Sequence, residues 1–132
     1  MKIIIAGGRE FSNFLLLCNV CDYLFQNLDE VEIISGMARG ADKLGHYYAK
    51  MRGYNVIEKP APWSDVQGKS SRELRMNDRG EKYWMLAGTF RNKEMADEAD
   101  CLILFWDGKS KGSRDMLHIA SKRGLKIKII KY

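Results

Sequence analysis

The chain has 132 residues, of which 45% are hydrophobic, a size that suits one globular domain around a single core. No apolar run approaches the roughly 20 residues that a membrane-spanning helix needs, so we expect no membrane partner. The first residues lead directly into a strand pattern instead of a signal peptide, and three cysteines within apolar runs give no disulfide framework, so we expect a cytoplasmic protein.

Strand and helix patterns alternate along most of the chain. Short runs rich in β-branched residues predict strands, and apolar residues at helical spacing predict helices. In chain order, the predicted elements are a strand over 2–6, a helix over 13–28, a strand over 32–35, a helix over 41–52, a strand over 54–59, a strand over 101–106, a helix over 113–123 and a strand over 125–132. Between the third and fourth strands lies a long excursion, with an expected insertion at about 64–90. An extra helix or a subunit contact is the interpretation that we favour there over a lid that closes on a site.

The formal net charge of +5 is unevenly spread along this series of elements. Residues 109–132 contain eight basic residues and a single acidic one, whereas the rest of the chain is slightly acidic. Such a local positive field suits a small anion. Nucleic acid is a less favoured partner, because the sequence shows no interleaving of aromatic and basic residues. A solvated lysine face that protects a sheet edge explains many of these lysines equally well.

Helix-length crossovers between strands predict a parallel sheet with both faces covered and right-handed connections. The predicted fold class is therefore α/β: a Rossmann-like three-layer sandwich with a mainly parallel five-stranded sheet in the order 3-2-1-4-5, as one domain over residues 1–132. In that order the sheet reverses between the first and fourth strands, and ligands bind there, beyond the carboxyl ends of the strands. Three loops would face this crevice: 7–9, 35–42 and 107–114.

Two glycine-bearing segments, 35–42 and 107–115, each follow a predicted strand and lead into a predicted helix. Glycine lets the main chain turn sharply and approach a ligand, and the free N–H groups at a helix N-terminus attract an anion. The two segments together predict a ligand with phosphate groups, such as a nucleotide. The candidate ligand-binding residues in the three loops are Gly7, Gly8, Arg9, Ser35, Gly36, Ala38, Arg39, Gly40, Asp42, Asp107, Gly108, Lys109, Ser110, Gly112, Ser113 and Arg114.

Several of these candidates have a second interpretation. Arg39 could donate two hydrogen bonds to a phosphate, or it could form an ion pair with Asp42. Asp42 could contact a ribose or cap its own helix. Ser113 could bind phosphate or serve as a plain helix N-cap. Trp63 is a further ligand-binding candidate because it could stack on a base, although a tryptophan that covers the end of a sheet is more common.

Five motifs, taken in order, resemble those of the SLOG superfamily, most closely its small stand-alone branch with a GxRxF start and an SGxARGAD loop. They lie at residues 7–11, 35–42, 60–63, 91–95 and 106–113 and span nearly the whole chain. The resemblance implies a Rossmann-like pocket for nucleotides or nucleotide-derived ligands, and it adds Arg91 and Asn92 to the candidate ligand-binding residues. Relatives include cytokinin-activating phosphoribohydrolases, DNA-processing proteins of the Smf type that bind single strands, and sensors of nucleotide signals in defence systems.

The resemblance to the phosphoribohydrolases implies catalytic roles for Asp115 and Arg91 if the chain is an enzyme. Asp115 stands at the acidic position of their PGGxGTxxE loop, and Arg91 stands in the place of their arginine. The chain departs from that loop, because residues 107–109 replace its Pro-Gly-Gly start and Asp115 is one methylene shorter than glutamate. These departures weigh against hydrolysis.

The leading hypothesis is a protein that binds a nucleotide or nucleotide-derived signal through its phosphates, as a sensor or a sequestering protein. The alternative is a nucleoside-monophosphate N-glycosidase that uses Asp115 and Arg91, and a third hypothesis is single-stranded nucleic-acid binding. No cofactor or metal site is predicted, because Cys18 and Cys21 form a CxxC within an apolar helix pattern that is typical of buried thiols. The apolar surface of the first helix leads us to expect a homodimer or a larger homo-oligomer.

Overall fold

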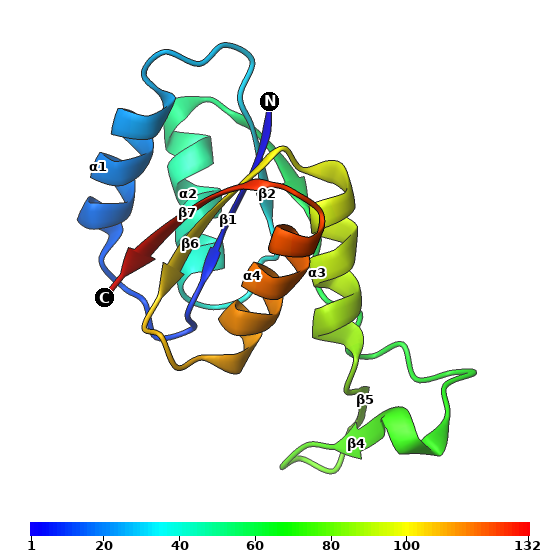
Figure 1. Ribbon diagram of the computed structural model, residues 1–132. Helices are drawn as coiled ribbons and strands as arrows, with labels where there is room; N and C mark the ends of the chain where they lie inside the picture. Colours follow the sequence, from blue (N-terminus) through cyan, green and yellow to red (C-terminus); the bar gives the residue numbers. More distant parts are fainter.

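The computed structural model describes residues 1–132, and a parallel sheet of five strands forms its middle layer (Figure 1). The strands, in sheet order, are β3 (Asn55–Glu58), β2 (Glu32–Ser35), β1 (Lys2–Gly7), β6 (Cys101–Trp106) and β7 (Lys126–Lys131). This order confirms the predicted order 3-2-1-4-5, because β6 and β7 are the fourth and fifth strands of the sheet. All pairings are parallel, so every strand ends at the same edge of the sheet.

Two helices cover each face of the sheet and complete the three predicted layers (Figure 1). One face carries α1 (Phe14–Phe25) and α2 (Ala41–Arg52), and the other carries α3 (Ala87–Glu98) and α4 (Lys111–Lys122). The strand order reverses between β1 and β6. In a Rossmann-like α/β fold this reversal opens a crevice between the loops that follow the neighbouring strands.

The central strands β1 and β6 are buried on both sides because their side chains alternate between two hydrophobic cores. Ile3 and Ile5 pack with α1 and α2, whereas Ile4 packs with α3 and α4. Parallel strands that are covered on both faces form continuous apolar runs. For this reason the sequence alone predicts β1 and β6 as strands. Their burial fixes the frame from which the loops at the carboxyl edge extend.

Helix α3 is the one helix that the hydrophobic pattern does not reveal. Its buried positions recur at helical spacing, but two of them, Arg91 and Asn92, are polar and interrupt the apolar stripe. The other helices begin within two residues of their predicted starts. Helix α4 begins at Lys111 instead of residue 113, because the hydroxyl of Ser110 caps it by accepting from the amide of Ser113.

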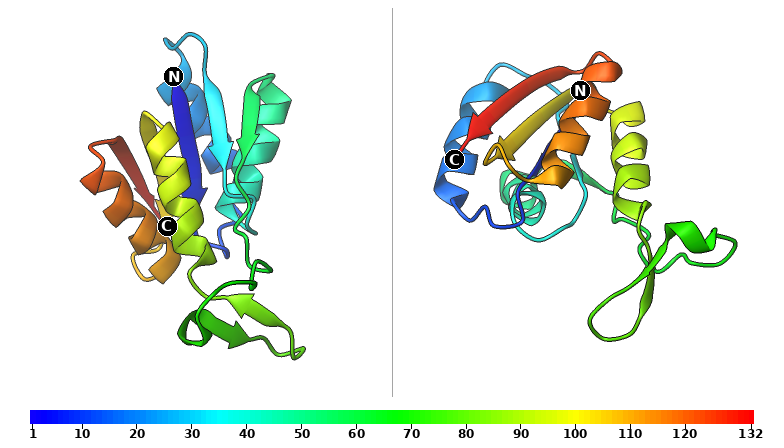
Figure 2. Two further views of the ribbon diagram at one scale, coloured as in Figure 1. Left: turned by 90° about the vertical axis from the view of Figure 1, so that its right-hand side faces the viewer. Right: turned by 60° about the horizontal axis from the view of Figure 1, so that its bottom comes forward.

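Residues 60–86, here termed the arm, leave the body at the carboxyl edge of the sheet and project away from it (Figure 2). Trp84 forms the centre of the arm: it is 8% exposed, its Nε1 donates to Glu73 Oε1 at 3.1 Å, and Lys69 Nζ lies 4.2 Å from its ring centroid. The arm therefore has a small core of its own, and it extends outward where a closed lid would cover the sheet edge. Its elements are a 3-10 helix, η1 (Ser71–Glu73), and two antiparallel strands, β4 (Leu74–Met76) and β5 (Lys82–Trp84).

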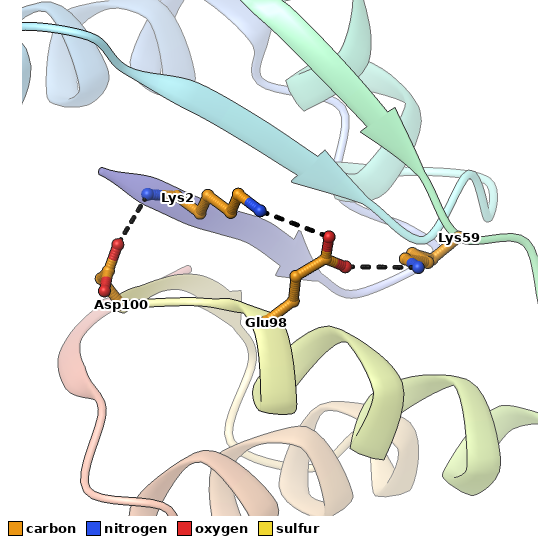
Figure 3. A network of polar contacts seen from close by, with 4 residues as sticks. All are labelled: Lys2, Lys59, Glu98 and Asp100. Carbon is orange, nitrogen blue, oxygen red and sulfur yellow. Dashed lines mark hydrogen bonds and ion pairs between the residues drawn. The ribbon is translucent and has the colours of Figure 1, made fainter.

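The C-terminal end of α3 is tied to the sheet by a carboxylate between two lysines (Figure 3). Glu98 lies 3.2 Å from Lys59 Nζ and 3.4 Å from Lys2 Nζ, and the Lys2 amide donates to the Asp100 carboxylate at 2.8 Å. The Lys59 ammonium, and after it that of Lys2, holds the pKa of Glu98 below its ordinary value. These contacts fix the helix that carries Arg91 against β1 and the end of β3.

Of the eight basic residues within 109–132, three lie along the edge of the sheet and the other five lie on α4 or next to its ends. Strand β7 exposes Lys126, Lys128 and Lys131, which protect an unpaired edge from other strands. Helix α1 exposes two large side chains, Leu15 and Tyr23, which are 71% and 72% exposed. The homo-oligomer that we expect from the apolar surface of this helix stays a prediction. None of the helices combines the length and the apolar character that crossing a membrane requires.

Candidate functional site

A cleft of about 370 Å³ lies at the carboxyl edge of the sheet, where the strand order reverses. It is bounded by the loop after β1, the loop before α2, the first half of α3 and the start of α4. Its volume falls within the range of small-molecule pockets, about 300–1,000 Å³.

The structure brings residues from all three predicted loops to this cleft. The predicted residues that line it are Gly7, Arg9, Ala38, Asp42, Trp63, Arg91, Asn92, Ser110, Gly112, Ser113 and Asp115. The predicted residues that do not line it are Gly8, Ser35, Gly36, Arg39, Gly40, Asp107, Gly108, Lys109 and Arg114. The second group either shapes the loops or lies outside the cleft at the surface.

The loop before α2 is held by hydrogen bonds within itself. Ser35 Oγ donates to the Asp42 carbonyl at 2.8 Å and accepts from the Met37 amide at 3.1 Å. The Ala38 amide donates to Asp42 Oδ2 at 3.4 Å. Several polar groups that an anion would use are therefore already paired, and this loop acts chiefly as a scaffold.

Two glycines let this scaffold approach its neighbours. Gly40 has a φ of 86°, and a Cβ there would overlap the Gly8 carbonyl oxygen. The same carbonyl accepts the Ala41 amide at 3.2 Å, so the loops after β1 and β2 touch through their main chains. At Gly36 a Cβ would overlap Arg91 Nη1, so the absence of a side chain lets the arginine of α3 dock on this loop.

Arg91 forms the basic floor of the cleft. It is 8% exposed, and its Nη1 donates to the carbonyl oxygens of Gly36 at 2.5 Å and Lys59 at 3.3 Å, while its Nε donates to Asn92 Oδ1 at 3.1 Å. Its Nη2 donates to no group of the protein. Because Arg91 lines the cleft, these free N–H groups are available to a bound acceptor.

Asp42 lies on the same floor and is 5% exposed. Burial raises its pKa to about 6, although the Arg91 guanidinium and the Ala38 amide act in the opposite direction. Burial also lowers the pKa of Arg91, and the carboxylate of Asp42 opposes that shift. The floor therefore holds a guanidinium next to a carboxylate that gains a proton at mildly acidic pH.

At the start of α4, unlike at the start of α2, several polar groups have no hydrogen-bond partner in the protein. The amides of Lys111 and Gly112 donate to no group of the protein. Ser113 is 4% exposed, and its hydroxyl has no hydrogen-bond partner. Free amides, the positive end of the helix dipole and an unpaired buried hydroxyl thus occur together at one end of the cleft. These are the groups that bind an anion at a helix N-terminus.

Two amides of the loop just before α4 are paired within that loop. Asp107 Oδ1 accepts from the amides of Ser110 at 2.9 Å and Lys109 at 2.8 Å, and these bonds hold the pKa of Asp107 below its ordinary value. Gly108, with a φ of 84°, makes the turn. An internal carboxylate therefore takes two amides that the sequence assigns to a phosphate, and the unpaired donors begin at Lys111.

Asp115 links α4 to α3 at the wall of the cleft. Its Oδ2 accepts from Asn92 Nδ2 at 2.9 Å and from Thr89 Oγ1 at 3.1 Å. Because Asn92 also accepts from Arg91, a continuous hydrogen-bonded chain runs from Arg91 to Asp115. This chain orients both side chains and leaves the second carboxylate oxygen without a partner from the protein, so it can accept from a ribose hydroxyl or face a cationic centre.

Trp63 and Arg9 stand at the rim. Trp63 is 38% exposed and lies over Gly88 of α3, where a Cβ would be 3.3 Å from the indole ring. Arg9 takes part in no salt bridge. Arg39 differs: it pairs with Glu10 at 2.7 Å, not with Asp42, and its side chain is 72% exposed outside the cleft.

Sequence reasoning misses several lining residues, most of them small or apolar. Lys111 could have been found from the sequence. It follows Ser110, and a serine N-cap at that position places the start of the helix at residue 111. Thr89 could have been found only with α3 already known, because it lies three residues before Asn92 and therefore on the same face of that helix. The missed residues are Ala6, Met85, Gly88, Thr89, Met95, Leu104, Lys111 and Met116.

The fold and the cleft define a Rossmann-like α/β protein with a site at the point where the strand order reverses. The model of a family described as YAcAr, the YspA, cpYpsA-related SLOG family, matches residues 1–65, from β1 to the start of the arm. The resemblance to the SLOG superfamily that the motifs predict is thereby confirmed. No curated protein sequence matches the chain at a significant level.

Two solved structures are similar to the whole chain. DNA processing protein A (DprA) from Streptococcus pneumoniae superposes with a TM-score of 0.69 at 20% sequence identity, over 99% of this chain and 50% of that one. DNA processing protein A from Helicobacter pylori, described for its single-stranded DNA binding mode, superposes with a TM-score of 0.58 at 17% identity, over 100% of this chain and 66% of that one. The chain thus spans about half of the first protein and two thirds of the second, and these likenesses show the fold.

Proposed function

We propose that this protein binds a nucleotide or nucleotide-derived signal, with a phosphate at the N-terminus of α4, and acts as a sensor or sequestering protein. The observation that carries the proposal is the unpaired hydroxyl of Ser113, which is buried beside the free amides of Lys111 and Gly112. A buried hydroxyl without a partner is costly, and a bound phosphate oxygen would satisfy it.

The other groups of the cleft suit the remaining parts of a nucleotide. Arg91 supplies free N–H groups to a second phosphate oxygen, and the free Asp115 oxygen is an acceptor for a ribose hydroxyl. Trp63, exposed at the rim, offers a face to a base. Arg9 and Lys111 add positive charge at the mouth of the cleft.

Calorimetric titration with adenosine monophosphate and the other common nucleoside monophosphates tests the proposal. Ser113→Ala should weaken binding of the preferred nucleotide by about 1.5–3 kcal/mol, the usual value of a hydrogen bond to a charged group. Ser121→Ala is the matched control, because Ser121 is exposed at the far end of the same helix and should leave the affinity unchanged. Equal affinities of the wild type and the Ser113→Ala variant would reject the phosphate site.

The geometry of Asp115 supports a second candidate, hydrolysis of the N-glycosidic bond of a nucleoside monophosphate. The carboxylate is oriented by Thr89 and Asn92, and Arg91 is held in the same hydrogen-bonded chain. In such a reaction Asp115 would stabilise the developing ribosyl cation or position water, and Arg91 would hold the phosphate.

Incubation with nucleoside monophosphates and chromatography of the products separate the two candidates. Release of free base that is lost in Asp115→Asn would establish the enzyme. Recovery of intact nucleotide after long incubation with a protein that binds it would establish the binder.

A further inference from the structure

Two main-chain hydrogen bonds close the root of the arm at the mouth of the cleft. The Trp84 amide donates to the Trp63 carbonyl at 2.8 Å, and the Met85 amide donates to the Glu73 carbonyl at 2.8 Å. Trp63 and Met85, at the two ends of the arm, both line the cleft. The arm is therefore continuous with the site, and it leaves the body at the carboxyl edge of the sheet (Figure 2).

Alternation along β5 sends its two aromatic side chains to opposite sides. Trp84 packs with Lys69 in the core of the arm and against Phe90 of α3, whose ring centroid lies 5.4 Å away. Tyr83 lies on the other side of the strand and is half-buried. Its ring lies 6.0 Å from that of Trp63 at an angle of 76°, so the aromatic surface of the rim extends from the cleft onto the arm.

A free cation accompanies this aromatic surface. Arg75 is the register partner of Tyr83 across the two strands, so both residues belong to the same face of the hairpin. Its Nη1 donates to the carbonyls of Arg72 and Leu74, and it forms no ion pair. By contrast, Lys69 and Arg79 of the arm pair with Asp65 and Glu81.

A partly exposed aromatic ring beside an unpaired arginine is the combination that binds one nucleotide of a strand, with the base on the ring and the phosphate at the guanidinium. We propose that Tyr83 and Arg75 form a second nucleotide subsite, so that the ligand of the cleft contains at least two linked nucleotides. This inference rests on the proposed function, because the cleft must hold the first nucleotide. The ligand is either a free dinucleotide or a segment of a longer single strand.

The test compares three probes at one salt concentration: adenosine monophosphate, a 5′-phosphorylated diadenylate and an octa-adenylate. The diadenylate should bind about tenfold more tightly than the monophosphate, since stacking of one base on an aromatic side chain contributes on the order of that factor or more. Tyr83→Ala should remove this advantage without changing the affinity for the monophosphate, and Tyr83→Phe should restore it. Met76→Ala is the matched control, because Met76 is 61% exposed on the other face of the hairpin.

The possible results separate this inference from the proposed function. If the monophosphate binds and the diadenylate binds no better, or if Tyr83→Ala leaves the advantage intact, the second subsite is rejected and the cleft stands. If neither probe binds, both the proposed function and the second subsite are rejected. An octa-adenylate that binds more tightly than the diadenylate, with an affinity that falls steeply with salt, identifies a strand as the ligand; equal affinities identify a dinucleotide.

Discussion

The N-termini of α2 and α4 look alike in sequence and differ in structure. Both follow a strand through a glycine-bearing loop, and both point toward the cleft. At α2, Ser35 and the buried carboxylate of Asp42 take up the polar groups of the loop. At α4, two amides and the hydroxyl of Ser113 remain without partners. Such a loop can receive an anion only where the chain has not already satisfied its donors.

Gly40→Ala should break the scaffold and give the largest effect. An added Cβ would overlap main-chain atoms of Gly8 and Arg9, and the φ of 86° is strained for any other residue. We expect the free energy of unfolding to fall by about 3 kcal/mol or more, measured by denaturant titration. Gly112→Ala, at the start of α4, is the control: a Cβ there meets nothing within 4 Å, so the change should stay within about 0.5 kcal/mol. Similar losses in both variants would contradict the contrast between the two loops.

Asp42→Asn should remove a pH dependence that belongs to the scaffold. Burial raises the pKa of Asp42 to about 6, whereas the unfolded chain has the ordinary value near 4, so the folded state binds more protons between these values. Stability of the wild type should therefore fall as the pH rises from about 4 to 7, by roughly 2–3 kcal/mol in total. The variant should lack this contribution. Parallel stability profiles of the two proteins over that range would show that Asp42 is not buried as described.

Ser113→Ala should leave the fold intact or stabilise it, although it weakens binding. The hydroxyl has no partner in the free protein, so its removal relieves a buried unsatisfied group. We expect a gain of up to about 1 kcal/mol in the free energy of unfolding without ligand. A clear loss of stability would mean that the hydroxyl already has a partner in the free protein and is not reserved for a ligand.

Arg39→Ala should have the smallest effect on both stability and binding. The side chain is 72% exposed and pairs with Glu10 on the surface, and such pairs contribute about 0–1 kcal/mol. Nucleotide affinity should be unchanged, because Arg39 does not line the cleft. A tenfold loss of affinity would return the phosphate site to the α2 loop, as the sequence motif alone suggests.

The sequence predicts the sheet well because its signals are local. Continuous apolar runs such as that of β6, together with glycines and prolines at element ends, define strands and crossovers, and the handedness of crossovers then limits the strand order. The arrangement of the crevice follows from the same order. Helix α3 escapes prediction because Arg91 and Asn92 occupy buried positions that ordinarily hold apolar side chains.

The site is less predictable because its chemistry depends on which polar groups find partners. The bonds from the amides of Lys109 and Ser110 to Asp107 are local and of a kind that an aspartate before a glycine favours, yet the sequence does not show that they compete with a phosphate. No local pattern shows that Gly36 leaves room for an arginine 55 residues away. The same holds for Asp115, whose orientation depends on contacts from another helix. Residue types and spacing thus locate the loops, whereas hydrogen bonding, both within a loop and between distant segments, decides which of them keeps free donors.

Amide chemical shifts, recorded while adenosine monophosphate or the preferred nucleotide is added to the ¹⁵N-labelled protein, report whether a phosphate binds at the N-terminus of α4. A phosphate at the open helix should shift the amide resonances of Lys111 and Gly112 strongly downfield, because these N–H groups gain an acceptor that the free protein lacks. The amides of Ala38 and Ala41, already bonded within the chain, should move little. Large shifts confined to the loop before α2, with Lys111 and Gly112 unmoved, would show that the phosphate does not bind at α4.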